Sequence, residues 1–123
     1  MQSDNVFEEN FDSVDDIEYK FKKTIQCGLV SEAKDFARRR QIKPTSQKAI
    51  ARKIFDETIA KLSTKKKVMQ HEISMPFEIA NTFNFNKNTK KVAVSVVHDY
   101  CKTKKDSNTI KRIQQEFPEY FNF

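Results

Sequence analysis

Apolar residues recur at every third or fourth position along most of this chain, which is the spacing that one face of an α-helix presents. The first segment with this pattern covers residues 14–26. Ser13 precedes it as a candidate N-cap, with Asp16 three positions later, and Gly28 follows it as a natural stop. The pattern predicts a helix over 14–26.

Two further helices are expected on either side of a proline. Ser31 is a candidate cap for a helix over 31–40, and a longer helix over 45–62 follows Pro44. The longer helix has a broad apolar stripe, which consists of Ile50, Ala51, Ile54, Phe55, Ile59 and Leu62.

The middle of the chain is ambiguous. Residues 68–75 fit either a strand or the continuation of a helix, and Pro76 suits the first turn of a short helix that ends near Phe83. Residues 92–97 contain four valines, and β-branched side chains favour a strand. We favour a helix there, because the helical spacing continues to Cys101.

That helix would be capped by Asn88 or Thr89, and a last helix is predicted from Ser107 or Asn108 to about Phe117. These segments together predict a mostly α protein, a compact bundle of about five short helices. The alternative is an α+β fold with short strands near 68–75 and 92–97.

Composition narrows the fold class further. The chain has 123 residues with one Gly, three Pro, no Trp and 11 Phe. So few glycines argue against a Gly-rich nucleotide-binding loop and against a turn-dense β sandwich. The length suits one domain, which we place at 13–123 after an acidic flexible arm over 1–12.

Charge is divided unevenly along the chain. The first 19 residues contain seven of the 17 acidic residues and no Lys or Arg, so the remainder carries a net charge of +13. A basic body of this kind suggests a polyanionic partner. The arm would either fold over the body and compete with that partner, or engage another protein through Phe7 and Phe11.

Enzyme chemistry has little support in the sequence. There is no HExxH, P-loop or nucleophile elbow, and the metal ligands Cys27, His71, His98 and Cys101 have no diagnostic spacing. We expect a protein that is not an enzyme and needs no cofactor or metal, with a nuclease built on dispersed acids as the alternative. Two distant cysteines and no signal or membrane-spanning segment predict an intracellular protein with reduced thiols.

Residues 31–62 resemble a helix-turn-helix, with Ile42 in the turn and Ala37 allowing close approach of the helices. This resemblance implies that Thr45, Ser46, Gln47 and Lys48 contact base edges while arginines bind phosphates. Residues 97–117 resemble a second copy. The stretch 27–44 is also similar to half of a pentatricopeptide-type repeat, although no internal repeat stands out.

Two other resemblances concern neighbouring segments. Residues 68–101 allow a ribbon-helix-helix interpretation, with 68–75 as the ribbon. The tail resembles the peptide motif that binds ring-shaped sliding clamps, and this implies partner contacts by Gln114, Phe117, Tyr120 and Phe121. The other interpretation of the tail is that its aromatic residues fold back to close the core.

The leading hypothesis is a small regulatory or accessory protein that binds nucleic acid, DNA more than RNA. The alternative is a protein-interaction factor that docks on a larger machine through its arm and its aromatic tail. The predicted nucleic-acid contacts are Arg38, Arg39, Arg40, Lys43, Thr45, Gln47, Lys48, Arg52, Lys65, Lys66, Lys67, Lys102, Lys104, Lys105, Asn108, Lys111 and Arg112.

Overall fold

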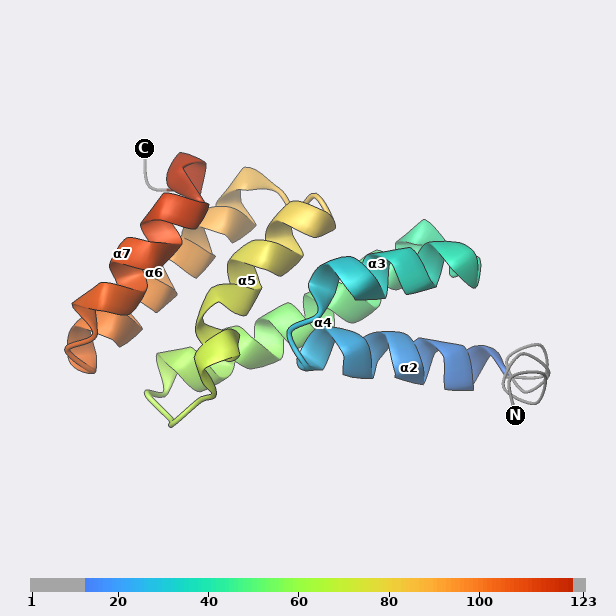
Figure 1. Cartoon of the computed structure of the whole chain (residues 1–123), viewed down its shortest axis with the longest axis horizontal. Coiled ribbons are helices and arrows are strands. Elements are labelled where there is room, and N and C mark those ends of the chain that lie inside the picture. Colours follow the sequence, from blue (N-terminus) through green and yellow to red (C-terminus); the bar gives the residue numbers. More distant parts are fainter. Residues whose placement is uncertain (1–12, 121–123) are drawn as a thin grey trace.

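The computed structural model describes residues 13–120, and this part of the chain folds into six α-helices and one short 3-10 helix, with no strand (Figure 1). The mostly α prediction is therefore confirmed. The elements in chain order are α2 (Val14–Gln26), α3 (Val30–Arg39), α4 (Pro44–Ser63), α5 (Gln70–Thr82), α6 (Lys87–Thr103), α7 (Ser107–Glu116) and η1 (Pro118–Tyr120). The predicted arm over 1–12 lies outside the described residues.

The helices pair as three successive hairpins. α2 packs against α3, α4 against α5, and α6 against α7 (Figure 1). The hairpins stack because α4 also contacts α2 and α6, and α3 also contacts α5. α4 is therefore the central helix. No internal repeat in the sequence corresponds to these three hairpins.

The five connections between helices use the same turn. Each has one residue with positive φ, and these are Gly28, Gln41, Lys65, Asn84 and Lys105. The N–H of the next residue donates to a carbonyl five positions back, as Ile42 does to Ala37 at 2.9 Å. This is the Schellman arrangement that ends helices. A chain with a single glycine thus makes five such turns. Asn84 adopts the left-handed conformation readily, whereas it costs roughly 1–2 kcal/mol at Gln41, Lys65 and Lys105.

Side-chain caps set the starts of three helices. The Oγ of Ser13 accepts from the N–H of Asp16 at 3.1 Å, as the sequence predicted. Asn86 caps α6, and Asp106 caps α7 through the N–H of Thr109. α6 therefore begins at Lys87, before its predicted caps Asn88 and Thr89, because Asn86 already presents an acceptor oxygen. α7 begins at Ser107, as the sequence predicted.

Two ambiguous segments are helical. α5 begins at Gln70, so a strand over 68–75 and the ribbon-helix-helix interpretation are wrong. Pro76 lies inside α5 and not in a first turn. A proline here removes one backbone hydrogen bond, yet its ring is fully buried in the core. Residues 92–97 lie within α6, as the helical spacing predicted.

Aromatic side chains join the hairpins in the core. Phe21 of α2 meets Phe83 at 5.9 Å between ring centroids, and Phe55 of α4 meets Phe85 at 5.5 Å, both edge to face. Such pairs add roughly 0.5–1.5 kcal/mol to the burial of their area. None of the helices in residues 13–120 has the length and apolar character needed to cross a membrane.

Candidate nucleic-acid interface

Ten of the basic residues predicted to bind nucleic acid fall into two groups near opposite ends of α4. Lys43 precedes this helix and Lys65 follows it. A helix of 20 residues is about 30 Å long, so the two groups do not form one surface. We call the group beside the α3–α4 turn the arginine turn, and it consists of Arg38, Arg39, Arg40 and Lys43. We call the other group the lysine edge, and it consists of Lys65, Lys66, Lys67, Lys102, Lys104 and Lys105.

The fold brings the lysine edge together from two distant turns. Lys65 forms an ion pair with Asp99 of α6, and this contact holds the α4–α5 turn against the last turns of α6. The α4–α5 and α6–α7 turns accordingly lie at the same end of the molecule (Figure 1). All six lysines except the half-buried Lys65 are exposed.

A hollow of about 470 Å³ lies between the C-terminal end of α4 and the side of α6. Two hydroxyls, an imidazole and two ammonium groups line it, together with half-buried valines. The polar lining residues are Ser63, Lys65, Ser95, His98, Asp99 and Lys102. Hydroxyl groups, the N–H of an imidazole and ammonium groups all donate hydrogen bonds to phosphate oxygens.

Two acids lower the positive charge of this edge. The hydrogen bond and charge of Lys65 hold the pKa of Asp99 below its usual range, so Asp99 is ionised at neutral pH. Hydrogen bonds from Thr109 likewise hold down the pKa of Asp106, which caps α7. Six lysines against two carboxylates leave the edge clearly positive. Some of this charge also offsets the dipoles of α4 and α6, whose C-termini lie here.

The α3–α4 segment differs from a helix-turn-helix in its packing. α3 packs against α2 and α5, whereas the motif would pack it mainly on α4. Ile42 is buried in the turn and Ala37 in the core, as the motif predicted. Gln47 is buried too, and its Nε2 donates to the carbonyl of Ile42 at 2.7 Å. The prediction that Gln47 contacts a base is therefore withdrawn, while Thr45 is exposed at the start of α4.

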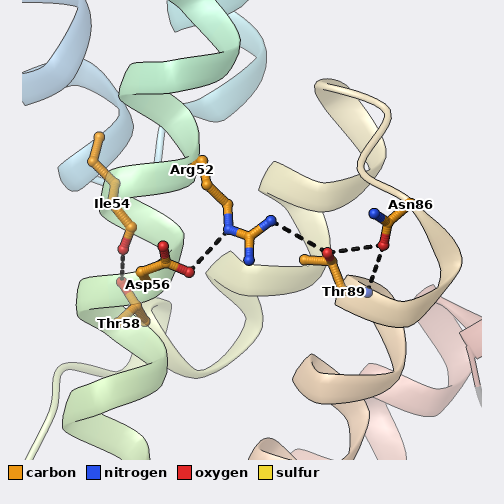
Figure 2. A network of polar contacts seen from close by, with 6 residues as sticks. All are labelled: Arg52, Ile54, Asp56, Thr58, Asn86 and Thr89. Atoms are coloured by element: carbon orange, nitrogen blue, oxygen red, sulfur yellow. Dashed lines mark hydrogen bonds and ion pairs between the residues drawn. The ribbon is translucent and has the colours of Figure 1, made fainter.

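Lys48 and Arg52 make contacts within the protein. Lys48 Nζ donates to the carbonyl of Asn84 at 3.2 Å. Figure 2 shows Arg52 between Asp56, at 3.0 Å, and the hydroxyl of Thr89, at 3.3 Å. Thr89 in turn donates to Asn86, so this chain of contacts connects α4 to the start of α6. Both cations thus help to position the central helix.

The second predicted helix-turn-helix covers α6 and α7, which do pack against each other. α7 starts at the lysine edge, and Asn108 is exposed in its first turn. Lys111 and Arg112 are exposed one turn further on, and Arg112 lies 3.9 Å from Glu116. The first turn of α7 therefore extends the lysine edge by one amide side chain.

The aromatic tail closes the core. Phe117 and Tyr120 are buried, and both rings contact Phe77 of α5. The hydroxyl of Tyr120 donates to Asn81 Oδ1 at 2.5 Å. The clamp-binding interpretation needs these rings outside the protein and does not fit. Gln114 is exposed, and Phe121 lies outside the described residues.

The candidate metal ligands are not gathered into a site. Within residues 13–120, no three His, Cys, Asp or Glu side chains are placed to hold a metal ion. The Nε2 of His71 lies 3.0 Å from the carbonyl oxygen of Gln26. Burial raises the pKa of the Cys101 thiol, while Cys27 is exposed.

The sequence identified the lysines as nucleic-acid contacts, but it did not identify Ser63, Ser95 and His98, which line the hollow beside them. Ser95, His98 and Lys102 are three and four positions apart, so they share one face of α6. That spacing was visible in the sequence, whereas the contribution of Ser63 depends on the packing of α4 against α6. Comparison with protein families, curated proteins and solved structures finds no match to this chain.

Proposed function

We propose that this protein binds nucleic acid through the lysine edge and the hollow beside it. The observation that carries the proposal is that two lysine clusters, 35 or more positions apart in the sequence, each contribute one lysine to the same hollow, Lys65 and Lys102. Hydroxyl, imidazole and ammonium groups line this hollow together with the carboxylate of Asp99, which pairs with Lys65. Each of these groups binds phosphate oxygens, and the polymer backbone presents phosphates at a regular spacing.

The chemistry of the edge favours binding of the backbone over reading of bases. Lysines and serines contact phosphates without regard to sequence, and the buried Gln47 cannot reach a base edge. We therefore expect little sequence preference. If the six lysines contact phosphates, affinity should fall roughly 10³-fold between 50 mM and 200 mM salt.

A matched pair of triple variants tests the proposal. The first, Lys66→Gln with Lys67→Gln and Lys102→Gln, removes three charges from the lysine edge. The second, Arg38→Gln with Arg39→Gln and Lys43→Gln, removes three charges from the arginine turn. Binding of labelled single-stranded and duplex DNA, and of RNA, is followed by fluorescence anisotropy at two salt concentrations.

The two variants separate site-specific binding from a simple effect of net charge. We expect the lysine-edge variant to lose at least about tenfold in affinity and to lower the salt slope by about three, with little change in the other variant. Equal losses in both would show that only overall charge matters. Absence of binding by the wild-type chain at low salt would refute the proposal, and circular dichroism confirms that both variants are folded.

A further inference from the structure

A second hollow lies at the N-terminal end of α4, beside the start of α2. It has a volume of about 320 Å³ and is formed by the first turns of α2 and by the α3–α4 turn. Its apolar wall consists of Val14, Ile17 and Ile42. An apolar cavity of ~150 Å³ already accepts a benzene ring, so this hollow has room for one aromatic side chain.

The apolar wall is incompletely covered by the described residues. Val14 is 69% exposed although it is the first residue of a helix that otherwise buries its apolar face. A side chain that covered it would remove apolar area from water, at roughly 25 cal/mol for each Å². The position of Val14, next to the point where residues 1–12 join α2, makes that segment the nearest candidate.

The rim of the hollow is basic. Arg40 and Lys43 line it, and the exposed Arg38 and Arg39 directly precede Arg40 at the end of α3. The guanidinium of Arg40 lies 6.0 Å from the centroid of the Phe36 ring. Glu18 is the one acid in the lining, so the rim favours an anionic occupant.

The composition of residues 1–12 is complementary to this hollow. The segment contains four acids and no Lys or Arg, and its apolar residues are Val6, Phe7 and Phe11, apart from the initial Met. We propose that residues 1–12 dock in the hollow, with a phenylalanine ring against the apolar wall and the carboxylates toward Arg40 and Lys43. Because the segment is tethered beside its site, its local concentration is high and weak contacts suffice.

This docking would leave the lysine edge open. The hollow and the lysine edge lie at opposite ends of α4, about 30 Å apart, and charges that distant are screened at 0.1 M salt. The arm would therefore not compete with nucleic acid at the lysine edge. The inference does not depend on the proposed function, because it concerns a different surface.

Photocrosslinking in the full chain tests the docking. Phe7→p-benzoylphenylalanine and Phe11→p-benzoylphenylalanine keep an aromatic ring at each position, and Gln2→p-benzoylphenylalanine is the control in the same segment. After irradiation, mass spectrometry locates the adducts. An adduct on residues 40–46 is decisive, because that region is far from the segment in sequence.

A second pair of variants, combined with the crosslinker at the more reactive position, tests the apolar wall. Val14→Asp adds a charge that repels the acidic segment, and an Asp in the first helical turn does not endanger α2. Tyr19→Asp makes the same charge change at another exposed position of α2 outside the hollow. We expect Val14→Asp to lower the yield of adducts on 40–46 at least fivefold and Tyr19→Asp to leave it nearly unchanged.

Several results would overturn the inference. These are the absence of adducts on 40–46 from both phenylalanine positions, an equal yield from the Gln2 control, and an equal effect of the two aspartate variants. Adducts found only between two chains, with a yield that falls on dilution, would instead show that the segment binds a second copy.

Discussion

Lys65 and Asp99 lie 34 positions apart in the sequence and form an ion pair that connects the α4–α5 turn to α6. The pair places a lysine and a carboxylate together at the hollow of the lysine edge. If phosphate binds there, Asp99 repels it and also competes for Lys65. Asp99 therefore limits the affinity of the proposed interface.

Asp99→Asn tests this role directly. Loss of the carboxylate frees Lys65, so the affinity for labelled DNA at low salt should rise roughly two- to fivefold. The control is Asp35→Asn, which removes the exposed partner of Arg38 at the arginine turn, 3.2 Å away. Fluorescence anisotropy should show no gain for that control, and a similar gain in both variants would contradict the prediction.

Gln47→Ala should affect stability and leave nucleic-acid binding unchanged. The substitution leaves the carbonyl of Ile42 without its hydrogen bond from Nε2, in a buried position. We expect the free energy of unfolding, measured with urea, to fall by about 1–3 kcal/mol. Thr45→Ala, at an exposed position of the same helix, should change it by less than about 0.5 kcal/mol. A loss of affinity without a loss of stability would restore Gln47 to the interface.

Truncation of the aromatic tail should destabilise the core. Tyr120→Ala removes a ring that is 1% exposed and contacts Phe77 and Phe117, so we expect a loss of about 3–5 kcal/mol. Gln114→Ala, at an exposed position, is the control and should have little effect. Urea unfolding measures both. Unchanged stability of Tyr120→Ala would favour a tail that serves a partner.

The hydroxyl of Tyr120 gives a test at high pH. Burial, with a smaller contribution from Glu119, raises the pKa of Tyr120 from 10.0 to about 12. The folded protein keeps this proton where the unfolded chain loses it, so stability falls as the pH rises from 10 to 12. The stability of the wild-type chain relative to Tyr120→Phe should decrease over that interval. A constant difference between the two proteins would refute the expected burial of the hydroxyl.

Glu78→Gln should stabilise the protein at neutral pH. Partial burial, aided by the charge of Glu116, raises the pKa of Glu78 above 4.5 despite a hydrogen bond with Ser74. The folded protein binds this proton more tightly than the unfolded chain does. Glu78 therefore stabilises the fold fully at a pH below its pKa in the unfolded chain, and this stabilisation is lost as the pH rises through its pKa in the folded protein. The urea midpoint of the variant should exceed that of the wild type at pH 7, and the difference should shrink at pH 4. Glu57→Gln, at an exposed position, serves as control.

Local features of the sequence determined most of the helices. The stripe over 45–62 predicted α4, and Ser13 with Gly28 correctly marked the limits of α2, because periodicity and capping act within a few residues. Pro76 misled the prediction of α5, since the burial of its ring depends on neighbouring hairpins. Propensity alone does not include that packing.

The candidate interface depended on tertiary structure. Charge along the chain identified the basic residues, and the length of α4 separates the lysine edge from the arginine turn. Only the stacking of the hairpins brought Lys65 and Lys102 to one hollow and buried Gln47 beside the arginine turn. Each of the five connections contains one left-handed residue, and in three of them this residue is Gln or Lys, which do not favour that conformation. Sequence patterns predict which face of a single helix is apolar. The contact between Lys65 and Asp99 of α6 instead results from the packing of apolar faces that are far apart in the sequence.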